Sequence, residues 1–81
     1  MKAHEVCVGY SIKLHEKGRY FTVKQIVKKV EFIEGQRTDR VVGIIFLDVC
    51  GSRQPQVHPD KEIIISPLLA YQLRTETNTD L

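Results

Sequence analysis

Basic side chains, which can hold phosphate groups or acidic partners, are concentrated in the first half of this 81-residue chain. Residues 1–43 carry nine Lys or Arg against five Asp or Glu, whereas residues 44–81 carry three against five. Tyr20 and Phe21 lie among these cations, and aromatic rings beside phosphate-binding cations can stack on the bases of a single strand. The contact set that we predict consists of Lys17, Arg19, Tyr20, Lys24, Lys28, Lys29, Arg37 and Arg40.

Two other interpretations of these charges remain open. Acidic residues are interleaved with the basic ones, as on an ordinary solvated surface, and the pI of about 8.6 lies below the range above roughly 9 that is typical of nucleic-acid-binding domains. A dipolar chain with a basic half and an acidic half can also orient a charged protein partner. The charge pattern therefore favours a binding surface without deciding between nucleic acid and protein.

Side chains of the kind used in catalysis are few. Cys50 with His58, or Ser52 with His58 and Asp60, would be needed to make a nucleophile–base pair, and these residues lie in one predicted loop or at its start. The chain has no glycine-rich phosphate loop and no motif of paired carboxylates. We therefore predict that the protein is not an enzyme and needs no cofactor.

Zinc is a further possibility that the sequence raises. His4, Cys7, Cys50 and His58 are zinc-type ligands, but the spacing from Cys50 to His58 is too long for the usual tight knuckle. We expect Cys7 and Cys50 to be small buried residues in neighbouring strands, and we predict no metal site.

The size of the chain predicts one small domain, residues 1–74, followed by a flexible tail, residues 75–81. Two cysteines are too few for a disulfide scaffold, no apolar leader follows Met1, and no run reaches the roughly 18–20 apolar residues of a membrane span. We therefore expect a cytoplasmic protein with reduced thiols. Small domains are marginally stable, which favours a partner subunit.

Two segments before the centre of the chain show β-type patterns. Residues 6–14 alternate apolar and polar side chains over nine residues, which predicts a half-buried strand, with Gly9 marking a bulge or bend. Residues 20–34 are rich in β-branched and aromatic residues, and one bulge near Lys24–Gln25 would restore their alternation. Lys28 then points to the same face of the strand as the core residues. We therefore expect it to lie where the strand leaves the core. Val23, Ile26, Val27 and Val30 also fit a helix, so strand is favoured and helix stays open.

The densest apolar run, Arg40–Cys50, is interpreted as the central strand of the sheet. Glu34–Asp39 is a polar hairpin connection before it, and Gly51–Lys61 is a loop or a turn with a weak strand. Glu62–Ile65 is a short closing strand. Ser66 and Pro67 have the residue types of a helix N-cap and first turn, and one or two helical turns over residues 68–73 are expected to pack over an end of the sheet.

This order of elements resembles the SH3-like small barrels, including modules of translation factors and ribosomal proteins. The resemblance covers residues 5–65 and rests on three stretches: Val8-Gly9-Tyr10-Ser11-Ile12, Tyr20-Phe21-Thr22-Val23 and Glu62-Ile63-Ile64-Ile65. The proline-ligand groove of some such barrels does not carry over, because the chain has no Trp. The fold class that we predict is mainly β: an SH3-like barrel or strongly bent antiparallel sheet of about five strands, with a short C-terminal helical turn.

The function expected from these features is that of a non-enzymatic binding module that self-associates and contacts a protein partner or nucleic acid through a basic rim. Apolar residues on both faces of Val41–Val49 need two covers, for which the helical segment or a second subunit is available. A winged-helix regulator is the alternative if Phe21–Val30 is helical.

Overall fold

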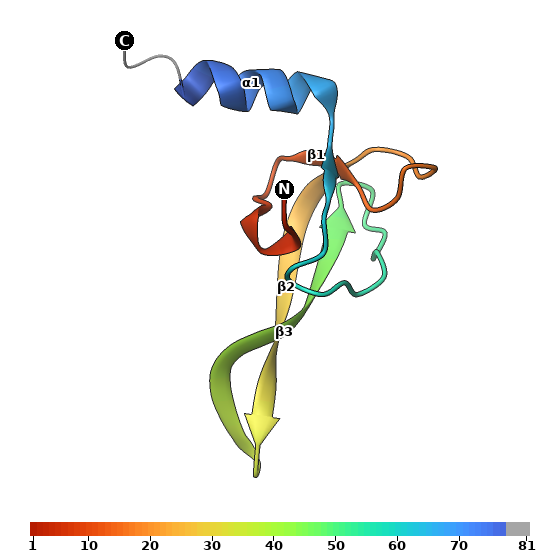
Figure 1. The fold of residues 1–81 in the computed structure, drawn as a ribbon. Coiled ribbons are helices and arrows are strands. Elements are labelled where there is room, and N and C mark those ends of the chain that lie inside the picture. The colour runs from red at the N-terminus through yellow and green to blue at the C-terminus, as the bar shows by residue number, and fades with distance from the viewer. Residues whose placement is uncertain (78–81) are drawn as a thin grey trace.

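The computed structural model describes residues 1–77 and is mainly β (Figure 1). A 3-10 helix, η1 (Ala3–Glu5), precedes the short strand β1 (Ser11–Lys13) and the long strands β2 (Phe21–Ile33) and β3 (Gln36–Asp48). The chain continues through β4 (Ile64–Ile65) into the helix α1 (Pro67–Thr77). These four strands form one open antiparallel sheet in the order β3-β2-β1-β4.

The ambiguous segment is a strand, so the pairing predicted between residues 20–34 and 41–50 is confirmed. Its β-branched residues outweigh the helical spacing, and the winged-helix alternative is wrong because no helix forms in Phe21–Ile33. The predicted bulge is also present. Val23 lies opposite Asp48 and Gln25 lies opposite Leu47, which leaves Lys24 as the extra residue of β2.

The hairpin between β2 and β3 turns over only two residues. Glu34 and Gly35 both have positive φ, 52° and 79°, and Ile33 pairs with Gln36. Two positive φ values in a two-residue loop define a type I′ turn, whose twist matches that of the flanking strands. The predicted six-residue connection, Glu34–Asp39, was therefore too long, because residues 36–39 belong to β3.

β3 lies at one edge of the sheet, so the prediction of Arg40–Cys50 as the central strand is wrong. Its outer neighbour is the connecting segment, which reaches β3 through the isolated bridges Ile44↔Val57 and Leu47↔Arg53. The backbone of Ile44 exchanges two hydrogen bonds with Val57, of 2.8 and 2.9 Å. The weak strand predicted within Gly51–Lys61 corresponds to these bridges. They cover only the inner half of the edge of β3.

β1 is much shorter than the predicted strand over residues 6–14. Gly9 has φ of 95°, its N–H donates to the carbonyl of Val23, and the N–H of Val23 donates to Tyr10. Two residues therefore oppose one, which makes the bulge expected at Gly9. Before the bulge the chain leaves the sheet, so Val8 is exposed instead of facing the core as its alternation predicted.

The core lies between the inner part of the hairpin, β1 and the two segments that flank them. Its most deeply buried large side chains are Phe46, Ile12, Ile44 and Val23. The N-terminal segment closes one side, since Ala3 and His4 donate backbone hydrogen bonds to Lys61 and Pro59. Burial of residues from opposite ends of the chain explains why so short a sequence forms a core at all.

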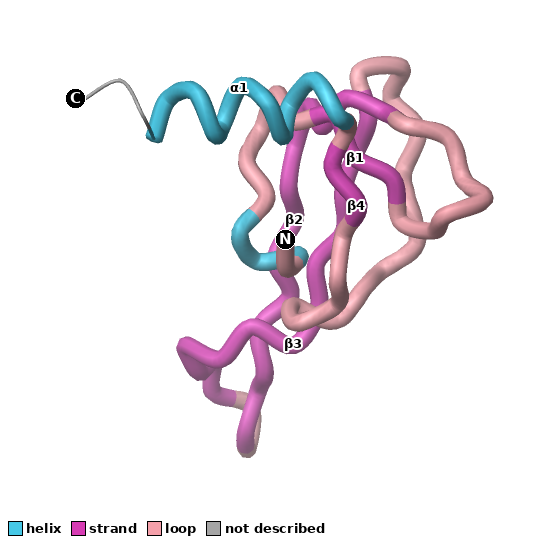
Figure 2. The backbone as a smooth tube through the Cα atoms, turned by 45° about the horizontal axis from the view of Figure 1, so that its top comes forward, coloured by secondary structure: helices cyan, strands magenta, loops and turns pink. Residues whose placement is uncertain are grey.

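α1 begins as predicted and extends further. The N–H of Leu69 donates to the Ser66 hydroxyl at 3.2 Å, which is the N-cap bond, and Pro67 occupies the first helical position. The helix continues through Thr77, and residues 78–81 of the predicted tail lie outside the described residues. Instead of lying over the sheet, α1 projects from the body at the end opposite the hairpin tip (Figures 1 and 2).

The mainly β class is thus confirmed, whereas the described residues form four strands in an open sheet instead of about five in a barrel. The principal extents of 49 × 31 × 20 Å reflect the two projecting elements. Within residues 1–77, no helix combines the length and the apolar character that crossing a membrane requires.

Candidate partner interface

The outer part of the hairpin, residues 28–42, extends beyond the core as a two-stranded ribbon that we call the β-arm (Figure 1). Ile26, Lys28, Val30 and Phe32 alternate along β2 and therefore share one face. Ile26 packs against the core and Val30 is half-buried, whereas Phe32 is 64% exposed. Lys28 is exposed opposite the buried Ile44, at the point where the sheet leaves the core, as its parity predicted.

Apolar side chains are also exposed elsewhere on the β-arm. Ile33 is 55% exposed next to the turn, and Val42 is 40% exposed on β3. Together with Phe32 they form the apolar set of the arm. Because neither face of the ribbon is covered at these positions, the arm has exposed apolar surface on both faces.

A break in the strand register shapes the middle of the β-arm. Val30 pairs with Val41 and Phe32 pairs with Arg37, so β3 carries additional residues in this interval. The Thr38 hydroxyl fills the irregularity: it donates to the Glu31 carbonyl at 2.9 Å and accepts from the Arg40 N–H at 3.3 Å. Bulged edges twist away from strand-to-strand pairing, so this region of β3 is suited to contacts through its side chains.

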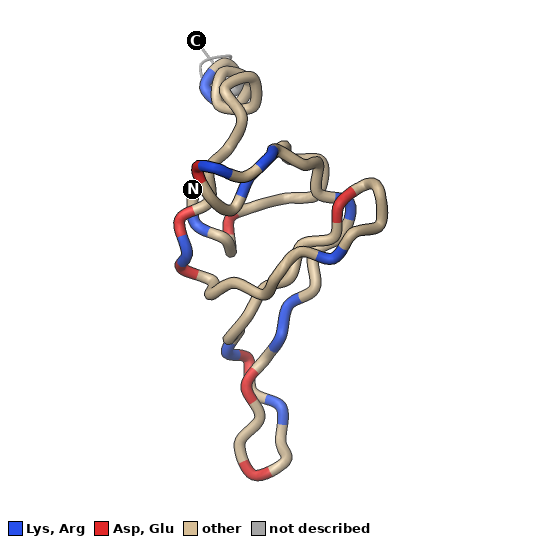
Figure 3. Tube along the Cα trace, turned by 90° about the vertical axis from the view of Figure 1, so that its right-hand side faces the viewer, with Lys and Arg blue, Asp and Glu red and all other residues tan. Residues whose placement is uncertain are grey.

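Most of the predicted contact residues are on the hairpin, and all of them are exposed. Lys28 and Lys29 are consecutive and therefore point to opposite faces of β2. Arg37 lies near the turn, and Arg40 lies 3.9 Å from the Glu31 carboxylate, a surface ion pair of little energetic weight. Figure 3 shows basic and acidic positions alternating down the arm.

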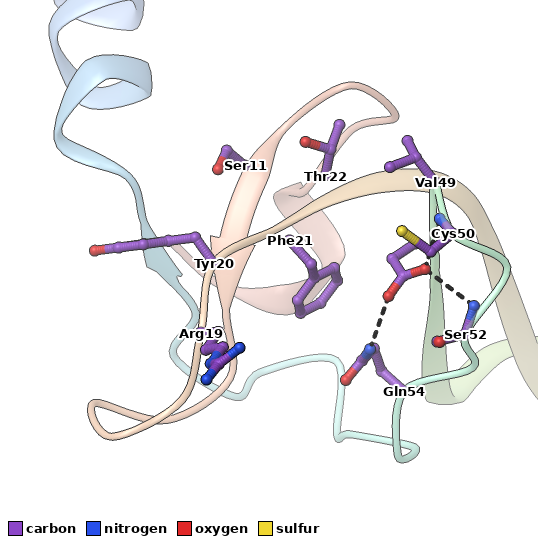
Figure 4. A pocket seen from close by; sticks show the side chains of 10 residues that line it. Ser11, Arg19, Tyr20, Phe21, Thr22, Val49, Cys50, Ser52 and Gln54 are labelled. Atoms are coloured by element: carbon purple, nitrogen blue, oxygen red, sulfur yellow. Dashed lines mark hydrogen bonds between the residues drawn. The ribbon is translucent and has the colours of Figure 1, made fainter.

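The remaining predicted residues, Lys17, Arg19 and Tyr20, are in the turn between β1 and β2. Arg19 and Tyr20 line an open pocket of about 650 Å³ at the end of the sheet (Figure 4). The other lining residues are Ser11, Phe21, Thr22, Asp48, Val49, Cys50, Ser52 and Gln54. The structure therefore separates Arg19 and Tyr20, which line this pocket, from the four predicted residues on the β-arm, while Lys17 lies in the β1–β2 turn and Lys24 at the bulge of β2.

Asp48 organises one wall of the pocket. Its Oδ1 accepts the backbone N–H groups of Cys50 and Ser52, each at 2.9 Å, and its Oδ2 lies 3.4 Å from the Gln54 amide. These bonds occupy the carboxylate within its own loop, as Figure 4 shows for part of the set. Asp48 therefore holds the wall in shape instead of presenting a free charge to a ligand.

Tyr20 is less available for stacking than the sequence suggested. The Lys13 ammonium lies 4.8 Å from the centre of its ring, and the same group donates to the Glu16 carbonyl at 2.9 Å. One face of the ring is thus occupied by a cation–π contact. Phe21 is half-buried and packs against the core, so it serves the fold.

Both cysteines are free and exposed, which corrects the expectation that they are buried in neighbouring strands. Cys7 precedes the turn at Gly9 and Cys50 follows β3, so each lies just outside a paired segment. Across residues 1–77, no group of three His, Cys, Asp or Glu side chains is arranged to hold a metal ion. His58 Nδ1 instead accepts the backbone N–H of Asp60 at 3.0 Å.

Within the apolar set, Val42 belongs to the run Val41–Val49 that the sequence predicted to need a second cover, whereas Phe32 and Ile33 were not identified as part of a contact surface. The sequence feature that could have located this surface is Lys28, a charged residue on the core-facing side of β2, because the β2 residues that follow it lie outside the core. Comparisons with protein-family models, with curated proteins and with solved structures gave no match, so the interface is described from the geometry of this chain alone.

Proposed function

We propose that the protein is a non-enzymatic binding module that contacts a protein partner through the β-arm and self-associates. The observation that carries this proposal is the exposure of Phe32, Ile33 and Val42 on a ribbon with only two strands. A two-stranded hairpin is marginally stable in water unless another surface packs on it. A partner that covers the apolar set would stabilise the arm and bind through the same contact.

The finer architecture and the location belong to this proposal as well. The bridges from β3 to Arg53 and Val57 support a body that is an incomplete SH3-like barrel, with the β-arm as an extension of two of its strands. We place the module in the cytoplasm, because two exposed free thiols suit a reducing compartment.

Sedimentation equilibrium of the full chain tests the proposal. The wild-type protein is expected to have a mass above 9.3 kDa, and Phe32→Asp is expected to return it to 9.3 kDa. Val8→Asp is the matched control, because Val8 is 61% exposed but lies outside the β-arm. The proposal would be contradicted if two results were found together. The wild-type protein would stay monomeric, and the immobilised wild-type protein would retain no more partner than immobilised Phe32→Asp.

Nucleic acid is the second candidate partner, favoured by the exposure of Lys24, Lys28, Lys29, Arg37 and Arg40 along one hairpin. A two-stranded ribbon fits the major groove of DNA, and cations on it would contact phosphates. Titration with a generic oligonucleotide should then show affinity that falls steeply from low to moderate salt. The double variant Lys28→Ala/Lys29→Ala should reduce the salt dependence, whereas Lys2→Ala/Arg74→Ala should not. Absence of binding at low salt would end this candidate.

A further inference from the structure

Two adjoining cavities lie at the end of the sheet away from the β-arm. The larger is the open pocket of about 650 Å³ beside the β1–β2 turn. A second cavity, of about 210 Å³, shares Arg19, Phe21 and Gln54 with it, so the two cavities meet at these residues. Figure 4 shows Arg19 and Gln54 on opposite sides of the hollow, with Phe21 between them. We call the two cavities together the turn site.

The smaller cavity of the turn site is an apolar compartment. Leu14, Phe21 and Pro55 contribute apolar side chains to its lining. Leu14 is buried and Phe21 packs against the core, so the fold fixes this wall. Because an apolar cavity of about 150 Å³ holds benzene, a volume of about 210 Å³ has room for one aromatic ring or a branched alkyl group.

Arg19 supplies a positive charge where the two cavities meet. Among residues 1–77, its guanidinium has no hydrogen-bond or ion-pair partner. Asp48, the acidic residue that lines the larger cavity, does not pair with it, because the Asp48 carboxylate is bonded within its own loop. A guanidinium binds a planar carboxylate through two parallel hydrogen bonds. One such cation balances one carboxylate.

The larger cavity adds hydrogen-bonding groups beside this cation. The hydroxyls of Ser11, Thr22 and Ser52 belong to residues of its lining, and a hydroxyl can both donate and accept. A ligand held by Arg19 therefore has an apolar compartment on one side and polar groups on the other. Concave sites with an apolar wall and a few converging polar groups are the usual form of a small-molecule site.

We propose that the turn site binds an organic acid that has one carboxylate and an aromatic or branched apolar body. The carboxylate pairs with Arg19, the apolar body fills the smaller cavity, and any further polar groups reach the hydroxyls of the larger one. A free acid and the C-terminal end of a peptide share this chemistry. The inference goes beyond the proposed function, because the turn site lies apart from the β-arm.

Titration of the full chain with phenylacetate, followed by nuclear magnetic resonance, tests the site. The amide signals of residues 19–22 and 48–54 should shift saturably. Arg19→Gln should raise the dissociation constant at least about tenfold, because a charge-assisted contact is lost. Arg37→Gln removes the same charge from the β-arm and should bind like the wild type. The neutral phenylacetamide should bind at least about tenfold more weakly than phenylacetate.

The two exposed cysteines provide an independent readout. Cys50 lines the larger cavity, whereas Cys7 lines neither cavity. N-acetylphenylalanine imitates the end of a peptide, and its acetamido group should extend into the larger cavity. It should therefore slow the alkylation of Cys50 by iodoacetamide and leave that of Cys7 unchanged, as measured by mass spectrometry. Tighter binding of N-acetylphenylalanine than of phenylacetate would identify a peptide end as the ligand, and weaker binding would identify a free acid; both results support the site.

Three results would overturn the inference. The first is the absence of saturable shifts up to about 10 mM phenylacetate, a range that includes a dissociation constant of about 1 mM. The second is an unchanged affinity in Arg19→Gln or for phenylacetamide, and the third is equal protection of the two cysteines. Phe32→Asp should bind phenylacetate like the wild type, so failure of the turn site leaves the proposed function of the β-arm standing.

Discussion

The Thr38 hydroxyl donates a hydrogen bond to the backbone carbonyl of Glu31 at 2.9 Å, across the point where β2 and β3 lose their register. The same hydroxyl accepts the N–H of Arg40, so one side chain bonds backbone groups of two residues that the strand register does not pair. The curvature of the β-arm in Figure 1 is therefore held by a side chain as well as by strand pairing.

Replacing Thr38 by Val should loosen the β-arm without unfolding the body. Loss of a partly buried hydrogen bond costs about 1 kcal/mol, and here the cost falls on a segment that few other contacts hold. Hydrogen exchange of amides 29–42 should become faster, while that of amides 44–46 stays unchanged. Thr38→Ser keeps the hydroxyl and should exchange like the wild type. Equal exchange in the Val and Ser variants would show that the hydroxyl is not what holds the arm.

Substitution of Glu34 should stabilise the type I′ turn, whereas substitution of Gly35 should destabilise it. Asn tolerates positive φ better than Glu, so Glu34→Asn should slow exchange in the arm. Gly35→Val places a β-branched residue at φ of 79° and should cost about 1–2 kcal/mol locally. Nuclear magnetic resonance of the strand pairing measures both effects. If Gly35→Val preserves the Ile33–Gln36 pairing, the turn type assigned to the hairpin is wrong.

Two phenylalanines of the same hairpin should differ in their importance for folding. Phe46 is fully buried, and Phe46→Ala should cost about 3–5 kcal/mol. A stability of about 0.05–0.15 kcal/mol per residue gives roughly 4–12 kcal/mol for a chain of this size, so this substitution removes a large part of it. Phe32→Ala at the same dilute concentration should change the urea midpoint little, because its side chain is exposed. Comparable midpoints for the two variants would place Phe32 in the core.

The N-cap of α1 offers a way to weaken the helix without touching its surface. Ser66→Ala removes the bond to the Leu69 N–H and should cost about 1 kcal/mol of helix stability. Helicity measured by circular dichroism should fall. Ser66→Asp, which retains a capping oxygen, is the control. Unchanged helicity in Ser66→Ala would mean that packing of Leu69 alone fixes the helix.

Local patterns predicted much of the secondary structure because they depend on neighbouring residues. The β-branched composition of Phe21–Ile33 favoured strand, and the slip in its alternation located the bulge at Lys24. Ser66 and Pro67 marked the start of α1 for the same reason, since capping involves residues within one helical turn. The predicted contact residues were chosen by residue type alone, so the sequence could not show that those on the hairpin lie apart from Arg19 and Tyr20.

The sequence by itself favoured an extended conformation for residues 20–34 and located the bulge of that strand and the start of the helix, because steric and hydrogen-bonding preferences act over a few residues. Only the tertiary structure decided that β3 lies at an edge, that Val8 and both cysteines face solvent, and that Phe32 projects beyond the core. Alternation shows which side chains share a face of a strand. Whether that face is covered depends on segments distant in the chain, such as the N-terminal residues and Val57, which reach the core only through the fold.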